Sequence, residues 1–96
     1  MRNWRRYERW YERRDEAVRR CFAELGDLPP KRAARRIERA QGDYLGSATW
    51  RLRRAGLPLP APVSRFADAI RELAVENDGR ALGVRQLLNI AAGRRR

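Results

Sequence analysis

Apolar residues recur along this chain at steps of three and four, which is the spacing of one face of an α-helix. The first such segment covers about residues 3–25, with Asn3 suited to the N-cap and Gly26 just beyond the end. Its apolar face, interrupted by one charge, consists of Trp4, Tyr7, Trp10, Tyr11, Arg14, Ala17, Val18, Cys21, Phe22 and Leu25. The other positions alternate arginine and acidic residues, which predicts an exposed helix face stabilised by ion pairs.

A second segment, about residues 30–55, keeps its helical phase across Gly42 and Gly46. One side carries Ala33, Ile37, Gln41, Tyr44, Ala48, Leu52 and Ala55. The opposite side carries Arg32, Arg35, Arg36, Arg39, Asp43, Ser47, Trp50, Arg53 and Arg54. Because a loop at the glycines would scramble this phase, the pattern favours one long helix, bent at 42–47 if the glycines interrupt it. Each glycine costs about 1 kcal/mol relative to alanine in a helix, so a break there is the alternative.

The rest of the chain predicts two shorter helices. A stiff proline-rich connector at 57–62 leads to a helix at about 63–77, and the turn sequence Asn77-Asp78-Gly79 precedes a last helix at about 80–92. No strand-like alternation occurs. We therefore predict an all-α fold, a compact bundle of about four helices in a single domain spanning 1–96, with a basic tail at 94–96.

Positive charge is concentrated in one part of the chain. The 96 residues include 23 basic and 12 acidic side chains, for a net charge of +11, and only Lys31 among the basic ones is a lysine. Residues 28–60 hold eight basic and two acidic side chains, and residues 94–96 add three arginines. Nine of the eleven excess charges therefore fall on the second predicted helix and the tail.

The residue types exclude several kinds of chemistry. The chain has no histidine, and hence no ordinary general base near neutral pH and no imidazole metal ligand. Cys21 is the single cysteine, which excludes an internal disulfide and a multi-cysteine zinc site. No window approaches the roughly 18 apolar residues of a membrane span, and the N-terminus lacks the apolar run of a signal peptide. We expect a cytoplasmic protein that is not an enzyme, has no cofactor or metal and does not engage a membrane.

The second predicted helix and the tail carry the candidate site. Guanidinium groups bind phosphate oxygens bidentately, and an indole among them can stack on an unpaired base. The candidate nucleic-acid-binding residues are Arg32, Arg35, Arg36, Arg39, Trp50, Arg53, Arg54, Arg94, Arg95 and Arg96. They predict a protein that grips the phosphate backbone, alone or as a small helical subunit of a nucleoprotein complex. An arginine-rich face is also typical of a solvated helix, Trp50 equally fits a packing role, and the pattern does not choose between DNA and RNA.

An aromatic group at the start of the first predicted helix gives an alternative. Half of the eight aromatic residues share one face there: Trp4, Tyr7, Trp10 and Tyr11. An exposed aromatic patch would serve a protein partner or a second copy of the chain. The alternative hypothesis is a protein-interaction module, such as a phage- or plasmid-type inhibitor or adaptor. It would dock on an acidic or nucleic-acid-binding surface through its basic and aromatic faces.

Overall fold

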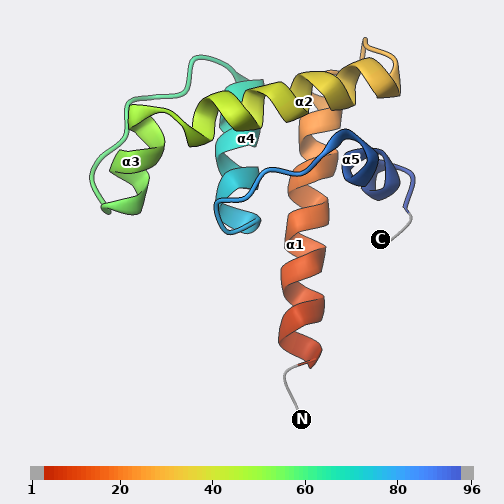
Figure 1. Ribbon diagram of the computed structural model, residues 1–96, viewed down its shortest axis with the longest axis horizontal. Helices are drawn as coiled ribbons and strands as arrows, with labels where there is room; N and C mark the ends of the chain where they lie inside the picture. The colour runs from red at the N-terminus through yellow and green to blue at the C-terminus, as the bar shows by residue number, and fades with distance from the viewer. Residues whose placement is uncertain (1–3, 94–96) are drawn as a thin grey trace.

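Five α-helices make up the part of the chain that the structure describes, residues 4–93 for the backbone and 8–93 for the side chains. In this computed structural model they are α1 (Trp4–Ala23), α2 (Pro30–Leu45), α3 (Ala48–Arg54), α4 (Arg65–Glu76) and α5 (Val84–Ala91). No strand occurs within residues 4–93, and the predicted all-α fold is confirmed. Figure 1 shows α1 and α4 side by side, α2 lying across one end of both, and α5 packed beside α1 and α2.

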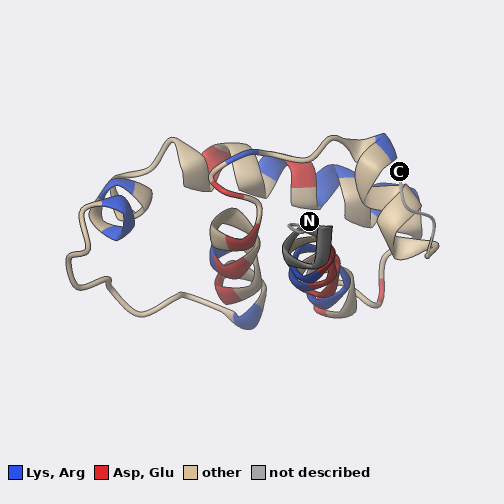
Figure 2. Cartoon of the chain, turned by 90° about the horizontal axis from the view of Figure 1, so that it is seen from below, with Lys and Arg blue, Asp and Glu red and all other residues tan. Residues whose placement is uncertain are grey.

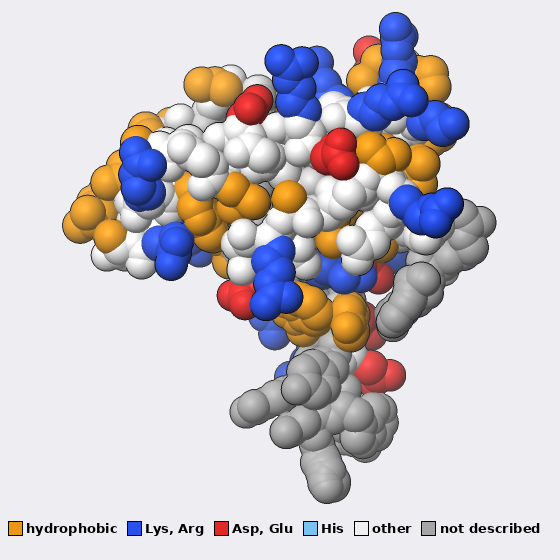
Figure 3. Space-filling model, viewed as in Figure 1, with side chains coloured by type: hydrophobic (Ala, Val, Ile, Leu, Met, Phe, Trp, Pro, Cys, Tyr) orange, Lys and Arg blue, Asp and Glu red, His pale blue; other side chains and the backbone are white. Residues whose placement is uncertain are grey.

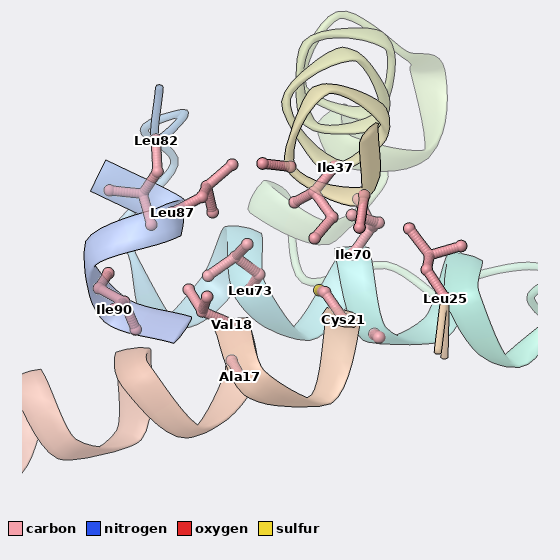
Figure 4. Close-up of a cluster of buried hydrophobic side chains, with 13 residues drawn as sticks. Ala17, Val18, Cys21, Leu25, Ile37, Ile70, Leu73, Leu82, Leu87 and Ile90 are labelled. Atoms are coloured by element: carbon pink, nitrogen blue, oxygen red, sulfur yellow. The ribbon is translucent and has the colours of Figure 1, made fainter. Parts of the chain in front are cut away.

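The core lies where α1, α2, α4 and α5 meet (Figure 4). Its members are Ala17, Val18, Cys21, Leu25, Ala33, Ala34, Ile37, Ala69, Ile70, Leu73, Leu82, Leu87 and Ile90. Each fully buried leucine or isoleucine contributes about 1.5–3 kcal/mol of transfer free energy. The apolar faces predicted for these helices therefore meet in one cluster, and Cys21 is packed within it as a small hydrophobic side chain.

One buried amide joins α2 to the loop before α5. The Gln41 side chain, in a residue only 2% exposed, donates from Nε2 to the Leu82 carbonyl at 3.0 Å. Its Oε1 accepts the Leu82 backbone N–H at 2.9 Å. The amide therefore satisfies both backbone groups of Leu82, a buried residue outside the helices. The loop follows the predicted turn, in which Asp78 and Gly79 both adopt positive φ (57° and 74°).

The prediction of one long helix over 30–55 is wrong at Gly46 and Ser47. Helix α2 ends at Leu45, and the Gly46 N–H bonds the Gly42 carbonyl. Ser47 then begins α3 as its N-cap, with Oγ accepting the Trp50 backbone N–H at 3.3 Å. The same hydroxyl donates to the Tyr44 carbonyl at 2.6 Å, so one side chain satisfies groups from both helix ends. Two helices replace the predicted one, and the bundle has five helices rather than about four.

The remaining differences concern helix ends and a few side chains. The helix predicted over 3–25 ends earlier, at Ala23, and those predicted over 63–77 and 80–92 are shorter at both ends. Asp15, a position expected on the exposed face of the first helix, is only 3% exposed. It forms an ion pair with the neighbouring buried Arg14, with 3.0 Å between Nη2 of Arg14 and Oδ1 of Asp15. In the connector at 57–62, Leu57 is 53% exposed.

Candidate nucleic-acid interface

The outer face of α2 carries an exposed row of arginines. The helix starts with Pro30, whose ring suits the first helical position, and its buried positions are Ala33, Ala34, Ile37 and Gln41. With that side against α4 and α5, the periodicity turns the other side to solvent. All of the candidate arginines on it are exposed: Arg32, Arg35, Arg36 and Arg39. The Arg36 guanidinium lies over the ring of Phe66 in α4, 5.5 Å from its centroid.

Helix α3 carries the second group of candidate arginines. Arg53 and Arg54 are exposed in its last turn, where the negative end of the helix dipole favours positive charge. Because α3 is a separate helix, they do not continue the α2 row along a single axis. In Figure 3, basic side chains gather at the upper right, over the start of α2, and at the left, over α3. The candidate arginines of α2 and α3 therefore form two clusters.

Two further basic residues extend these clusters. Lys31 is exposed in the first turn of α2, and Arg51 is exposed on α3. Neither was among the candidates that the sequence singled out. The signal for Lys31 was its spacing of four residues from Arg35, which places both on one side of α2.

Trp50 packs α3 onto the rest of the molecule. Its ring is half-buried and meets Tyr44 edge-on, with ring centroids 5.7 Å apart. It also covers the turn between α4 and α5, where Cζ2 lies 3.0 Å from the position a Cβ on Gly79 would occupy. Since α3 has no buried residue of its own, this indole is its main anchor. Packing thus occupies much of the ring surface considered for base stacking.

The acidic side chains lie mainly on other helices. Seen from below in Figure 2, α4 carries acidic positions along its length, whereas α3 shows basic positions and no acidic ones. Arg20 of α1 donates to Asp68 and to Glu72 of α4. These two hydrogen bonds raise the pKa of the Arg20 guanidinium above its usual range. Among the described residues, no ion pair involves a side chain of α2 or α3.

A groove between α3, the connector and α4 differs in character from the basic clusters. Its volume is about 400 Å³, and its charged lining is balanced: Arg20, Arg53, Arg71, Asp68, Glu72 and Glu76. Arg71 also donates to the Pro60 carbonyl at 2.7 Å. The hydroxyl of Tyr44, which lines the groove, is buried without a hydrogen-bond partner. Because acidic groups match the arginines here, the groove does not favour a polyanion.

The aromatic candidates of α1 are only partly described. Trp10 and Tyr11 are half-buried neighbours with ring centroids 4.6 Å apart, and the Arg14 guanidinium lies near both rings. The N-terminal half of α1, to which both residues belong, extends past the other helices in Figure 1. The side chains of Trp4 and Tyr7 lie outside the described residues, and so do Arg94, Arg95 and Arg96.

Two further features of the described chain concern metal ions and membranes. Its cysteine, aspartate and glutamate side chains form no group of three or more that could hold a metal ion. None of the described helices combines the length and the apolar character needed to cross a membrane. Comparisons of the chain with protein-family models, with curated proteins and with solved structures found no match.

Proposed function

We propose that this protein binds nucleic acid without catalysing a reaction, by holding the phosphate backbone with the exposed arginines of α2 and α3. One observation carries the proposal: these side chains are exposed, and none of the ion pairs in the described chain involves them. Like charges three and four residues apart on one helix are mildly destabilising, so an arginine row without acidic partners costs folding free energy. Phosphates supply the missing negative charge, and guanidinium groups fit their oxygens.

The contacts are expected to be with the backbone and not with base edges. The basic residues are spread over two helices, α2 and α3, and Trp50 is engaged in packing α3. Backbone contacts fix orientation and affinity without reading sequence. About four to six such contacts give a log–log slope of affinity against salt between about −3.5 and −5.5 on duplex DNA.

Fluorescence anisotropy with a labelled DNA duplex and a labelled single strand tests the proposal. Affinity should fall steeply between about 50 and 200 mM salt. The double variant Arg35→Glu with Arg39→Glu should remove most of the binding. The control, Arg65→Glu with Arg85→Glu, makes the same change in net charge at exposed positions of α4 and α5 and should bind far better. Absence of binding, binding insensitive to salt, or equal losses in the two double variants would refute the proposal.

A second candidate function rests on the half-buried rings of Trp10 and Tyr11. They stand on the part of α1 that projects from the bundle, where a partner protein could cover them. Under this alternative the chain is an interaction module and its basic helices dock on an acidic protein surface. It predicts a stoichiometric protein partner that stays bound after nuclease treatment, or a dimer by light scattering. A nuclease-sensitive association of a monomer would favour the first proposal.

A further inference from the structure

Gly42 is a glycine that the fold itself does not require. It lies inside α2, where glycine is the least favourable residue after proline. A Cβ built at this position has no neighbour within 4 Å, and its φ lies outside the left-handed region. Close packing and positive φ, the usual structural reasons for a glycine, are therefore both absent. A glycine at this position leaves the helix surface open to the close approach of something outside the chain.

The exposed face of α2 divides into two rows that differ in their surroundings. The Lys31 row consists of Lys31, Arg35, Arg39 and Gly42, at helical steps of four, four and three. The Arg32 row consists of Arg32, Arg36 and Asp43 and runs beside it on the side of α4.

The Arg32 row is poorly suited to phosphate. Its Arg36 is placed over the Phe66 ring, and its last member is a carboxylate. Arg36, Arg39, Asp43 and Phe66 line one hollow of about 330 Å³, so the carboxylate faces the same space as the engaged guanidinium and as Arg39 of the Lys31 row. A phosphate chain passing on this side would meet the negative charge of Asp43.

The Lys31 row ends in open space at Gly42 and has one acidic neighbour on that side, Glu38. The Glu38 carboxylate is turned toward the start of α5, where Gly83 is the N-cap. Its Oε2 lies 3.8 Å from the position that a Cβ on Gly83 would occupy. Steps of four residues advance about 6 Å along α2. Alternate phosphates of one duplex strand advance about 7 Å along the duplex axis, so successive members can reach alternate phosphates.

We propose that a nucleic-acid backbone runs along α2 on the Lys31 row, with Lys31 and Arg35 holding phosphates and Gly42 at the point of closest approach. This inference rests on the proposed function and deepens it. It assigns binding to one side of the helix, adds Lys31 to the contacts and gives the glycine a role. A side chain at Gly42 would hold the backbone away from the helix and lengthen every contact of the row.

Two comparisons with the labelled DNA duplex test the inference. The first pairs Gly42→Leu with Ala91→Leu, which adds similar bulk at an exposed position of α5. Gly42→Leu should raise the melting temperature, by about 4 °C or more, because leucine is a far better helix former than glycine. It should nevertheless weaken binding about tenfold, whereas Ala91→Leu should bind like the parent. Higher stability with lower affinity is a combination that a purely structural glycine does not produce.

The second comparison removes two charges from each row. Lys31→Gln with Arg35→Gln should weaken binding about tenfold and reduce the salt slope by about 2. Arg32→Gln with Arg36→Gln, of equal charge change, should cost much less. Equal effects of the two double variants, or parental binding by Gly42→Leu, would overturn the inference while leaving the proposed function intact. Absence of duplex binding by the parent protein would overturn both.

Discussion

Replacing Gln41 by leucine should unfold the protein at a much lower temperature, although leucine is apolar and similar in size. Gln41 and Leu82 are 2% and 3% exposed, and the two hydrogen bonds between them satisfy both backbone groups of Leu82. Leucine would leave that buried N–H and that carbonyl without partners. Each unsatisfied buried group costs about 1–3 kcal/mol, so we expect a loss of about 2–5 kcal/mol. That is a large part of the roughly 5–15 kcal/mol by which a small domain is stable.

Thermal and urea unfolding followed by far-UV circular dichroism measure this loss. For a domain of this size about 1 kcal/mol corresponds to about 4–8 °C, so the melting temperature should fall by at least about 10 °C. Gln86→Leu, at an exposed position of α5, is the control and should stay within about 0.5 kcal/mol of the parent. A Gln41→Leu variant as stable as Gln86→Leu would refute the reasoning, because the amide would then contribute no net hydrogen-bond free energy.

Three further predictions concern other parts of the fold. Gly79→Ala should cost about 1–3 kcal/mol in urea unfolding and change the Trp50 fluorescence, because its φ is 74° and the indole lies 3.0 Å from the new methyl group; an unchanged emission would contradict this packing. Burial raises the pKa of the Cys21 thiol to about 12, so the unfolded chain ionises first and stability should fall as pH rises from about 9 to 12; Cys21→Ala should lack that component, and a thiol reagent should modify the parent only after denaturation. Arg20→Gln should cost no more than about 1 kcal/mol, and less at high salt, because Arg20, Asp68 and Glu72 are 37–50% exposed.

The sequence predicted the apolar faces of the helices well, because a buried stripe fixes which residues of a helix are exposed. For α2 it predicted both the buried side and the exposed arginines. It missed the break after Leu45 because the helical phase is the same before and after Ser47. Serine is a favoured N-cap, so Ser47 did carry a local signal for a new helix start.

The pattern of apolar and polar residues does not predict contacts between residues that are far apart in the sequence. The sequence predicted ion pairs within the exposed face of the first helix, whereas Arg20 of that helix binds two carboxylates of α4, about 50 residues away. Gln41 was placed on the apolar side of its helix, but its partner Leu82 is set by the path of a loop. Likewise, the difference between the Lys31 row and the Arg32 row depends on Phe66. The packing of α4 against α2 brings this ring to Arg36, and the sequence of α2 alone does not show it.

The way α3 is attached has a consequence for the dynamics of the basic surface. Among the helices, α3 has backbone neighbours only in α2. None of its side chains is fully buried, and the Trp50 ring, which packs on Gly79, makes its main contact with the rest of the molecule. Undocking such an element costs little more than exposing that ring, about 2 kcal/mol, so about 3% of molecules would have α3 open at any moment. Amide hydrogens of α3 should then exchange long before those of α2. One part of the basic surface, on α2, would then be rigid and the other, on α3, hinged. Under the proposed function this would let one small chain follow backbones of different curvature.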